Sequence, residues 1–333
     1  MTTHSKWLRG AALSLALVFA TTDLAVPEEA AEMQLEAKIA LGPVAGRIDH
    51  MAVDAKREHL FVAELGNNSV GVVDLANGTV AHRIGGLSEP QGVAYLEATD
   101  TLYVANAGDG SVRMFRGSDH AATGQIGLGS DADNIRFDAT DRRLLVGYGS
   151  GALAVIDPTA NRVTGHFTLK AHPESFQIDS NSDRIFVNLP DAHAIAVLER
   201  TTGKPVAEWS MTDSANFAMA LDREQPRLFA VFRRPAKLVS LSTQTGKPLA
   251  ETPTCGDADD LFVDAKRQRI YVVCGEGFVD VFDAQDIRRR LAHIPTIEGA
   301  RTALFVPERD RLYVAARAQG KEPAAIWVLR PAP

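Results

Sequence analysis

The only two cysteines of the chain stand on either side of a group of acids, and both residue types bind metals or take part in covalent chemistry. Residues 255–277 read CGDADDLFVDAKRQRIYVVCGEG. The side chains of interest are Cys255, Asp257, Asp259, Asp260 and Cys274. Three interpretations fit them: a metal site of thiolates and carboxylates, a hairpin closed by a disulfide, or one copy of a longer repeat.

Motifs of common catalytic and cofactor sites are absent from the sequence. The chain contains no G-x-S-x-G nucleophile turn and no H-E-x-x-H zinc helix. The cysteines have no histidine at zinc-finger spacing, and no C-x-x-C-H haem attachment site occurs. The sequence therefore requires no cofactor and disfavours a zinc ribbon.

The opening stretch recurs along the chain about every 42 residues. Clear copies begin at Asp54 (DAKREHLFVAEL), Asp138 (DATDRRLLVGYG) and Asp264 (DAKRQRIYVVCG). To align the seven copies, we take the first large residue of the central strand-like run of each copy as its anchor. Successive anchors are 42, 42, 41, 43, 42 and 42 positions apart. The anchors are Phe61, Tyr103, Leu145, Phe186, Phe229, Tyr271 and Tyr313. This regularity indicates seven equivalent structural units.

Each copy predicts four short strands separated by turn residues. A four-stranded unit repeated about every 40–45 residues is typical of a propeller blade. We therefore predict an all-β fold, a seven-bladed β-propeller of four-stranded antiparallel blades, as one domain over residues 33–331. The seventh copy has only three strands, the last near Ala325–Leu329. We expect MQLEAKIAL (33–41) to supply its fourth strand and close the ring, because closure removes exposed sheet edges.

One copy carries a family signature. Tyr103-Val104-Ala105-Asn106 is followed by a GDGSV turn and strand, and the other six copies keep an aromatic or aliphatic first residue but depart at the Asn. The chain resembles the YVTN-repeat β-propellers, including the exported YncE-like members, over roughly residues 33–331. The resemblance implies the propeller fold, and it leaves the activity open because this family is functionally mixed.

The repeat predicts where polar groups converge. In a propeller the first strand of each blade lines the central channel, so the residues twelve positions before the anchors form a ring at its mouth. They are Asp49, Gln91, Asp133, Glu174, Phe217, Asp259 and Arg301. From this ring and the following position we select nine candidate ligand-binding residues: Asp49, His50, Gln91, Asp133, Asn134, Glu174, Asp259, Asp260 and Arg301.

Three interpretations of the mouth stay open. The acids bond backbone N–H groups and hold solvent, or they bind a hard cation such as Ca²⁺ through carboxylate and amide oxygens. Alternatively, the mouth is a small-molecule pocket in which Arg301 pairs with a carboxylate and His50 or Glu174 acts as a general base. The oxygen ligands for Ca²⁺ would come from Asp49, Asp133, Asn134, Glu174 and Asp259.

The N-terminal residues predict export. Lys6 and Arg9 precede the apolar run Ala11–Ala20, which is too short to span a bilayer and is typical of a secretory signal peptide. We expect a signal peptide over 1–20, with cleavage after Ala20 or alternatively Ala25, and a linker over 21–32. The mature chain is then a periplasmic or secreted monomer without a membrane span. Its negative charge, −7 for the whole chain, disfavours nucleic acid as a partner.

Export also permits a disulfide between Cys255 and Cys274. Counting back from the AKRQ turn pairs Val263 with Ile270 and puts Cys274 opposite Asp259 or Asp260. On a straight strand Cys255 would lie about 13 Å further along. Bonding needs Cα atoms within about 7 Å, so the chain has to bend near Gly256.

The favoured function from sequence is a non-catalytic binding or scaffold protein that presents its loops and channel mouth to a partner protein or small ligand. The alternative is a lactonase-type hydrolase or a metal-dependent enzyme that uses the acidic ring. It rests on analogy with other seven-bladed propellers and on the ring, His50 and Arg301. No residue requires the further option of a quinone-dependent redox role.

Overall fold

The computed structural model of the protein describes Met1, Thr2 and residues 32–333. The predicted signal peptide (1–20) and linker (21–32) lie outside the described residues, apart from Met1, Thr2 and Glu32. Among the described residues, no helix has the length and apolar character needed to cross a membrane.

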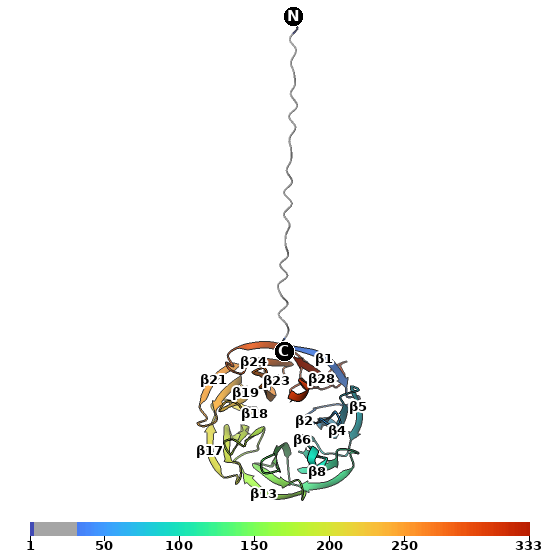
Figure 1. Ribbon diagram of the computed structural model, residues 1–333, viewed down its shortest axis with the longest axis vertical. Coiled ribbons are helices and arrows are strands. Elements are labelled where there is room, and N and C mark those ends of the chain that lie inside the picture. Colours follow the sequence, from blue (N-terminus) through green and yellow to red (C-terminus); the bar gives the residue numbers. More distant parts are fainter. Residues whose placement is uncertain (3–31) are drawn as a thin grey trace. The chain divides into compact units, whose positions relative to one another are not determined.

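Seven four-stranded antiparallel sheets form a ring of blades, and the first strand of each blade lies nearest the centre (Figure 1). Blade 1 comprises β2 (Met51–Asp54), β3 (His59–Glu64), β4 (Ser69–Asp74) and β5 (Thr79–Ile84), and blade 2 comprises β6 (Pro90–Leu96), β7 (Thr101–Asn106), β8 (Ser111–Arg116) and β9 (Ala122–Gly127). Blade 3 comprises β10 (Ala132–Asp138), β11 (Arg143–Tyr148), β12 (Ala152–Asp157) and β13 (Arg162–Thr168), and blade 4 comprises β14 (Phe176–Asp179), β15 (Arg184–Leu189), β16 (Ala194–Glu199) and β17 (Pro205–Ser210). Blade 5 comprises β18 (Ser214–Asp222), β19 (Arg227–Arg234), β20 (Ala236–Ser242) and β21 (Pro248–Pro253), and blade 6 comprises β22 (Ala258–Asp264), β23 (Arg269–Cys274), β24 (Phe278–Asp283) and β25 (Arg290–Pro295).

Blade 7 is built from both ends of the described chain. It comprises β26 (Ala303–Val306), β27 (Arg311–Ala316), β28 (Ala325–Pro331) and the N-terminal strand β1 (Met33–Ala40). Within the described residues, four 3₁₀ turns lie in loops: η1 (Leu65–Asn67), η2 (Glu97–Thr99), η3 (Pro190–Ala192) and η4 (Pro307–Arg309). The predicted all-β class, the seven four-stranded blades and the closure by residues 33–41 are confirmed.

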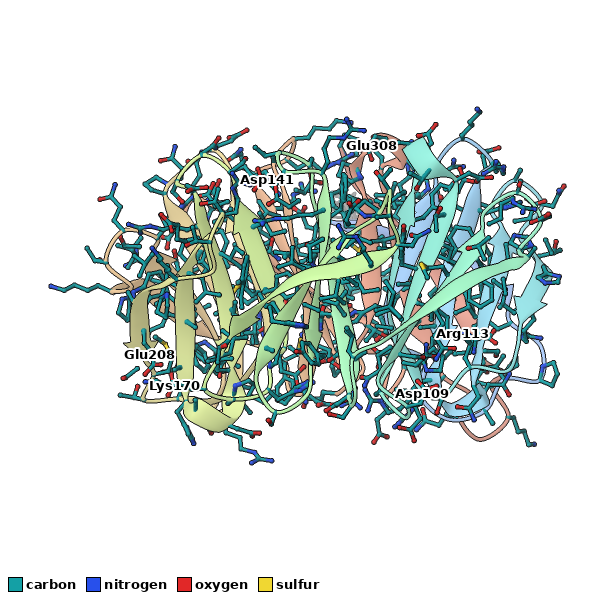
Figure 2. All side chains as sticks on the ribbon, turned by 90° about the horizontal axis from the view of Figure 1, so that it is seen from below. Asp109, Arg113, Asp141, Lys170, Glu208 and Glu308 are labelled. Carbon is teal, nitrogen blue, oxygen red and sulfur yellow. A yellow bond between two sulfur atoms is a disulfide. The ribbon has the colours of Figure 1, made fainter. Side chains whose placement is uncertain are left out.

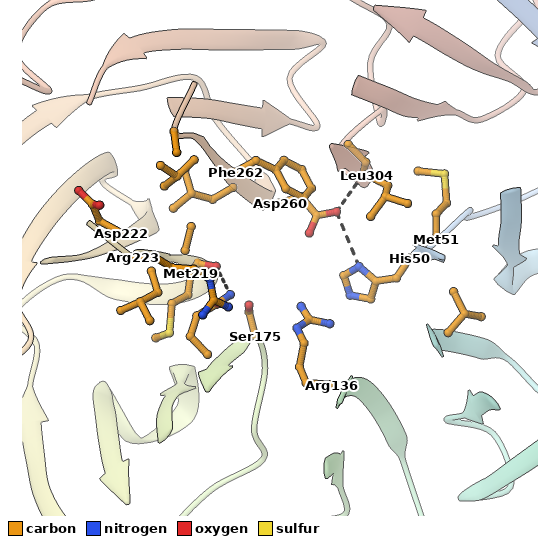
Figure 3. Close-up of a pocket in the computed structure, with 18 residues that line it drawn as sticks. His50, Met51, Arg136, Ser175, Met219, Asp222, Arg223, Asp260, Phe262 and Leu304 are labelled. Carbon is orange, nitrogen blue, oxygen red and sulfur yellow. Dashed lines mark hydrogen bonds and ion pairs between the residues drawn. The ribbon is translucent and has the colours of Figure 1, made fainter. Parts of the chain in front are cut away.

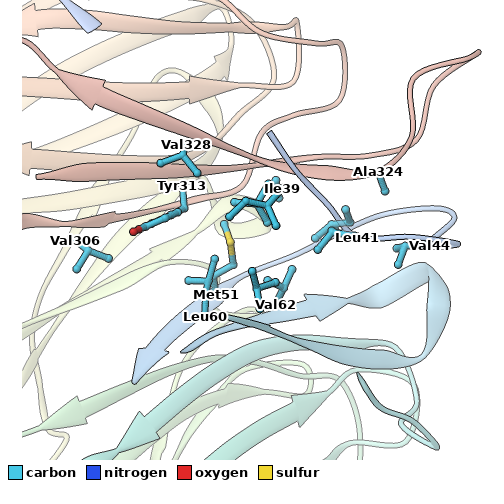
Figure 4. Close-up of a cluster of buried hydrophobic side chains, with 14 residues drawn as sticks. Ile39, Leu41, Val44, Met51, Leu60, Val62, Val306, Tyr313, Ala324 and Val328 are labelled. Atoms are coloured by element: carbon cyan, nitrogen blue, oxygen red, sulfur yellow. The ribbon is translucent and has the colours of Figure 1, made fainter. Parts of the chain in front are cut away.

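The closing strand is held by backbone pairing and by packing. β1 pairs antiparallel with β28, from Met33 opposite Pro331 to Ala40 opposite Ala325. Ile39 is buried in a cluster in which Tyr313 and Val328 of blade 7 meet Met51 and Leu60 of blade 1 (Figure 4). β1 therefore completes blade 7 and also contributes to its contact with blade 1.

Burial explains why the strands differ in composition. The middle strands of a blade are covered on both faces by neighbouring blades, so they read as continuous apolar runs. Val72 and Val73 are fully buried, whereas the outer strand β5 is exposed or half-buried except at Ile84. The blade contacts are therefore made mainly by the middle strands.

The repeated Asp at the start of the copies has a structural role. The Asp54 carboxylate accepts hydrogen bonds from the backbone N–H groups of Lys56 and Arg57, which fixes the turn from β2 to β3. Asp138, Asp222 and Asp264 fix the corresponding turns of their blades. These turns lie on the face that carries Asp141 and Glu308, opposite the face of Asp109 and Lys170 (Figure 2).

The two cysteines form a disulfide in blade 6. Their sulfur atoms are 1.97 Å apart and their Cα atoms 5.8 Å apart. Val263 pairs with Ile270 as expected, but a bulge between Ala258 and Asp260 shifts the register. The expected position of Cys274 is therefore corrected: it lies opposite Ala258, not opposite Asp259 or Asp260.

Loss of this disulfide is expected to lower the free energy of unfolding by about 3 kcal/mol, because the bond closes a loop of 19 residues and restricts the unfolded chain. Urea unfolding of the oxidised and dithiothreitol-reduced protein would measure the difference. The Cys255→Ala/Cys274→Ala variant is the control and should show no response to reductant. Equal unfolding midpoints with and without reductant in the unaltered protein would contradict the expectation.

Candidate functional site

The seven ring positions meet in one cavity at the channel mouth. Its volume is about 260 Å³, and one residue from each blade lines it: Asp49, Gln91, Asp133, Glu174, Phe217, Asp259 and Arg301. His50 and four residues not selected from the sequence complete the lining: Arg47, Asp131, His172 and Arg233. Ten of these twelve side chains are ionisable, and both signs of charge are present.

Bulges turn the ring residues toward the channel. In blade 1 the Asp49 N–H donates to the carbonyl of Ala63, and the Ala63 N–H donates to the carbonyl of His50. Two consecutive residues, Asp49 and His50, therefore pair with the single residue Ala63. Glu174 and Ser175 share Asn188 in the same way in blade 4. In blades 2, 3, 5 and 6 the strand register shifts at the ring position. Such bulges re-aim side chains and are frequent beside functional sites.

One side of the mouth carries two arginines that are paired with aspartates. Arg301 makes two 2.9 Å hydrogen bonds from Nη1 to the carboxylate of Asp257, and its Nε lies 3.3 Å from Asp259. Arg233 donates from Nη2 to Asp259 over 2.7 Å, and its guanidinium lies 3.8 Å from the ring centroid of Phe217. These contacts hold both guanidinium groups in fixed orientations.

The other side carries three acids and a histidine. His172 Nδ1 lies 2.6 Å from the carbonyl oxygen of Gly149 and 3.4 Å from Asp131. Its Nε2 lies 3.9 Å from Oδ2 of Asp133. Glu174 lies close to both, since one ligand atom each of Asp133, His172 and Glu174 fall within 4.8 Å of one another.

A second cavity of about 410 Å³ lies deeper in the channel and shares His50 with the mouth. His50 Nδ1 is 3.7 Å from Asp260 Oδ2, which also accepts a 2.8 Å hydrogen bond from the Ala303 N–H (Figure 3). Arg136 points into this cavity near His50 (Figure 3). Burial lowers the pKa of Arg136, and this effect is larger than the opposite effect of the nearby carboxylates of Asp260 and Asp133.

Burial and repulsion between carboxylates raise the pKa of Glu174 and Asp259. Burial, together with Asp133 and Asp259, raises the pKa of Glu174 to about 8. Burial raises the pKa of Asp259 to about 6, although Arg233 lowers it. Burial alone would lower the pKa of His50, but Asp260 and the other nearby carboxylates raise it to about 10.

Two of the selected residues lie away from the mouth. Asp260 lines the deeper cavity, and Asn134 is buried without lining either cavity. Three of the four lining residues that were not selected share a repeat position two residues before the ring, which reads Arg47, Glu89, Asp131, His172, Ala215, Asp257 and Gly299. Aligning that position as well would have found them. Arg233 lies at the end of β19, and no repeat position singled it out.

Comparison with known proteins supports the fold. The sequence matches no protein-family model, and no curated protein sequence matches it. The structure is similar to a chain of hydrazine synthase from Kuenenia stuttgartiensis, with a TM-score of 0.71 and 16% identity over 87% of this chain and 95% of that chain. It is also similar to a chain in the mitotic checkpoint complex, with a TM-score of 0.76 and 14% identity over 97% of this chain and 99% of that chain.

Together these observations define the class of the protein. It is a seven-bladed β-propeller with an ionisable channel mouth. At 14–16% identity the likeness to the two solved structures concerns the fold alone. The propeller fold fits a binding or scaffold role, and it leaves the particular ligand or partner to be argued from the site.

Proposed function

We propose that the chain is an exported, non-catalytic binding protein of the YVTN-repeat, YncE-like class, and that its channel mouth holds a small polar ligand bearing a carboxylate. Export to the periplasm or outside the cell is supported by the sequence of residues 1–20. The class is supported by Tyr103-Val104-Ala105-Asn106, which ends strand β7, and by the GDGSV turn into β8.

The observation that carries the binding role is the placement of two arginines on one side of the mouth and of Asp131, Asp133 and Glu174 on the other. The polar contacts of Arg301 with described residues use Nε and Nη1, and those of Arg233 use Nε and Nη2. One terminal NH₂ group of each guanidinium is therefore available to a ligand. Arginine binds carboxylates through paired N–H donors, and the contacts with Asp257 and Asp259 preorganise both groups.

The opposite side suits the other end of such a ligand. Asp131, Asp133 and Glu174 offer acceptor oxygens across the mouth from the arginines. A volume of about 260 Å³ limits the ligand to a small molecule, because pockets for drug-sized ligands begin at about 300 Å³. Glutamate carries a carboxylate for the arginines and an amine for the acids, so it has the proposed chemistry.

Calorimetric titration with glutamate, succinate and putrescine tests the proposal. Glutamate and succinate should bind, whereas putrescine, which has no carboxylate, should not. Arg301→Gln should weaken binding at least about 10-fold, in line with the loss of a charged hydrogen-bond partner. Arg288→Gln, in an exposed loop, is the matched control and should leave binding unchanged. Binding of putrescine alone, or equal binding by Arg301→Gln, would contradict the proposal.

A second candidate function is hydrolysis of lactones. It is favoured by Glu174, whose raised pKa of about 8 lies near neutral pH, where a general acid or base works best. A panel of lactones followed by acid release would test it. Turnover that disappears in Glu174→Gln would support an enzyme, and absence of turnover would leave the binding role.

A further inference from the structure

We propose that Asp133, His172 and Glu174 bind one divalent transition-metal ion on the acidic side of the mouth. The inference goes beyond the proposed binding role, since a metal can occupy these side chains whether or not a carboxylate binds the arginines. It also replaces the five oxygen ligands that the sequence suggested for Ca²⁺ with a set of three ligands that includes an imidazole nitrogen.

The three ligand atoms are close enough to share an ion. One atom from each residue lies within 4.8 Å of the others, and the separation of His172 Nε2 from Asp133 Oδ2 is 3.9 Å. Metal–ligand bonds of about 2.0–2.2 Å allow two ligand atoms to lie up to about 4.4 Å apart. Small side-chain rotations therefore suffice to bring all three atoms to one ion.

His172 is oriented as a metal ligand. A carbonyl oxygen only accepts hydrogen bonds, so the 2.6 Å contact with Gly149 requires that Nδ1 carries a proton and donates it. In the neutral ring the lone pair is then on Nε2, the atom nearest Asp133. Histidines that bind metals commonly donate their other N–H to a backbone carbonyl or a carboxylate, and Asp131 lies 3.4 Å from the same Nδ1.

Asp133 has an oxygen without a partner. The residue is 5% exposed, and its Oδ1 has no hydrogen-bond partner among the residues that the structure describes. Burying a carboxylate oxygen without a partner is costly, and a bound cation removes this cost. Asp49 and Asp259, by contrast, have arginine partners at 2.8 and 2.7 Å.

The ligand set indicates the class of metal. One imidazole nitrogen and two carboxylate oxygens suit Zn²⁺ or Mn²⁺, whereas Ca²⁺ takes about six to eight oxygen ligands and no nitrogen. Asp49 and Asp259 accept hydrogen bonds from arginines instead. Three protein ligands would leave at least one coordination position for water or a bound molecule.

Titration of the EDTA-treated mature protein with Zn²⁺, Mn²⁺ and Ca²⁺ tests the inference. Zn²⁺ or Mn²⁺ should bind with one ion per chain, and Co²⁺ should give a visible absorption band from its coordination by protein ligands. His172→Ala and Asp133→Asn should each weaken binding at least about 100-fold, the upper end of the loss seen when only a supporting partner is removed. His166→Ala is the control, because His166 is exposed on β13.

Three results would overturn the inference: no binding of Zn²⁺, Mn²⁺ or Co²⁺, binding of Ca²⁺ alone, or binding equally strong in His172→Ala. Circular dichroism without metal checks that each variant is folded. If Asp133→Asn does not fold, Glu174→Gln replaces it in the metal titration. Succinate titration of the metal-free protein separates the two proposals. Succinate binding without metal binding would overturn only the metal site, and the reverse result would overturn only the carboxylate ligand.

Discussion

A mature chain that begins at Gly42, and so lacks residues 33–41, is expected to lose cooperative folding. The deletion removes the buried side chains of Met33, Ile39 and Leu41. At about 1.5–3 kcal/mol each, these contribute roughly 5–9 kcal/mol, which is comparable to the whole stability of a typical domain, about 5–15 kcal/mol. The deletion also leaves β28 as an unpaired edge that invites association with other chains.

The control is a circular permutant that begins at Gly42 and carries residues 33–41 after Pro331. Met33 lies opposite Pro331, so a short turn joins them, and the permutant should melt as the unaltered protein does. In the intact chain, Ile39→Ala should cost about 2–5 kcal/mol, while the exposed Gln34→Ala should stay within about 0.5 kcal/mol. A deletion variant that melts cooperatively at the unaltered temperature would contradict ring closure as a source of stability.

Stability is expected to decrease as the pH rises from 7 to 9.5. The pKa of His50 is about 10 in the folded protein and about 6.5 in the unfolded chain, so folding takes up a proton in this range. The stabilisation is complete below about pH 6.5 and is lost as the pH approaches 10. One proton taken up by His50 corresponds to a slope of about −1.4 kcal/mol per pH unit. Glu174 and His172, whose pKa values are raised to about 8 and about 9, make the slope steeper in the lower part of this range.

Urea unfolding of the metal-free protein at several pH values measures this slope. Asp259 acts with the same sign at lower pH, because its raised pKa of about 6 makes the folded state hold a proton that the unfolded chain releases near pH 3.9. His120, whose pKa is lowered by burial, acts in the opposite sense below its ordinary pKa of about 6.5, so the chosen range avoids it. His50→Gln should make the slope less negative by about 1.4 kcal/mol per pH unit, the contribution of one proton. A stability that is flat or rising between pH 7 and 9.5 would refute the charged state of His50.

The fold could be predicted from the sequence because a propeller repeats one structural unit. Spacing alone gave the seven blades, and the three strands of the last copy indicated that residues 33–41 must supply a fourth. Local irregularities could not be read in this way. The bulge before Asp260 adds a residue without changing the hydrophobic pattern, and it moved Cys274 to a position opposite Ala258.

The ring at the mouth was found by alignment, but its electrostatic character was not. Taken alone, the ring positions hold four acids and one arginine, which left a hard-cation site among three open interpretations. The structure adds Arg47 and Arg233, which neutralise Asp49 and Asp259, and His172, which changes the ligand chemistry beside Asp133. These partners come from a neighbouring repeat position and from the end of β19, so no single aligned column contains them.

We propose that this protein binds its ligand at the channel mouth. A crystal structure of the mature protein soaked with glutamate would show where the ligand lies. We expect electron density in the cavity lined by the seven ring residues, with the ligand carboxylate on Arg301 and Arg233 and its amine toward Glu174. Density for glutamate only at other surfaces, at a concentration that saturates the calorimetric titration, would contradict the claim.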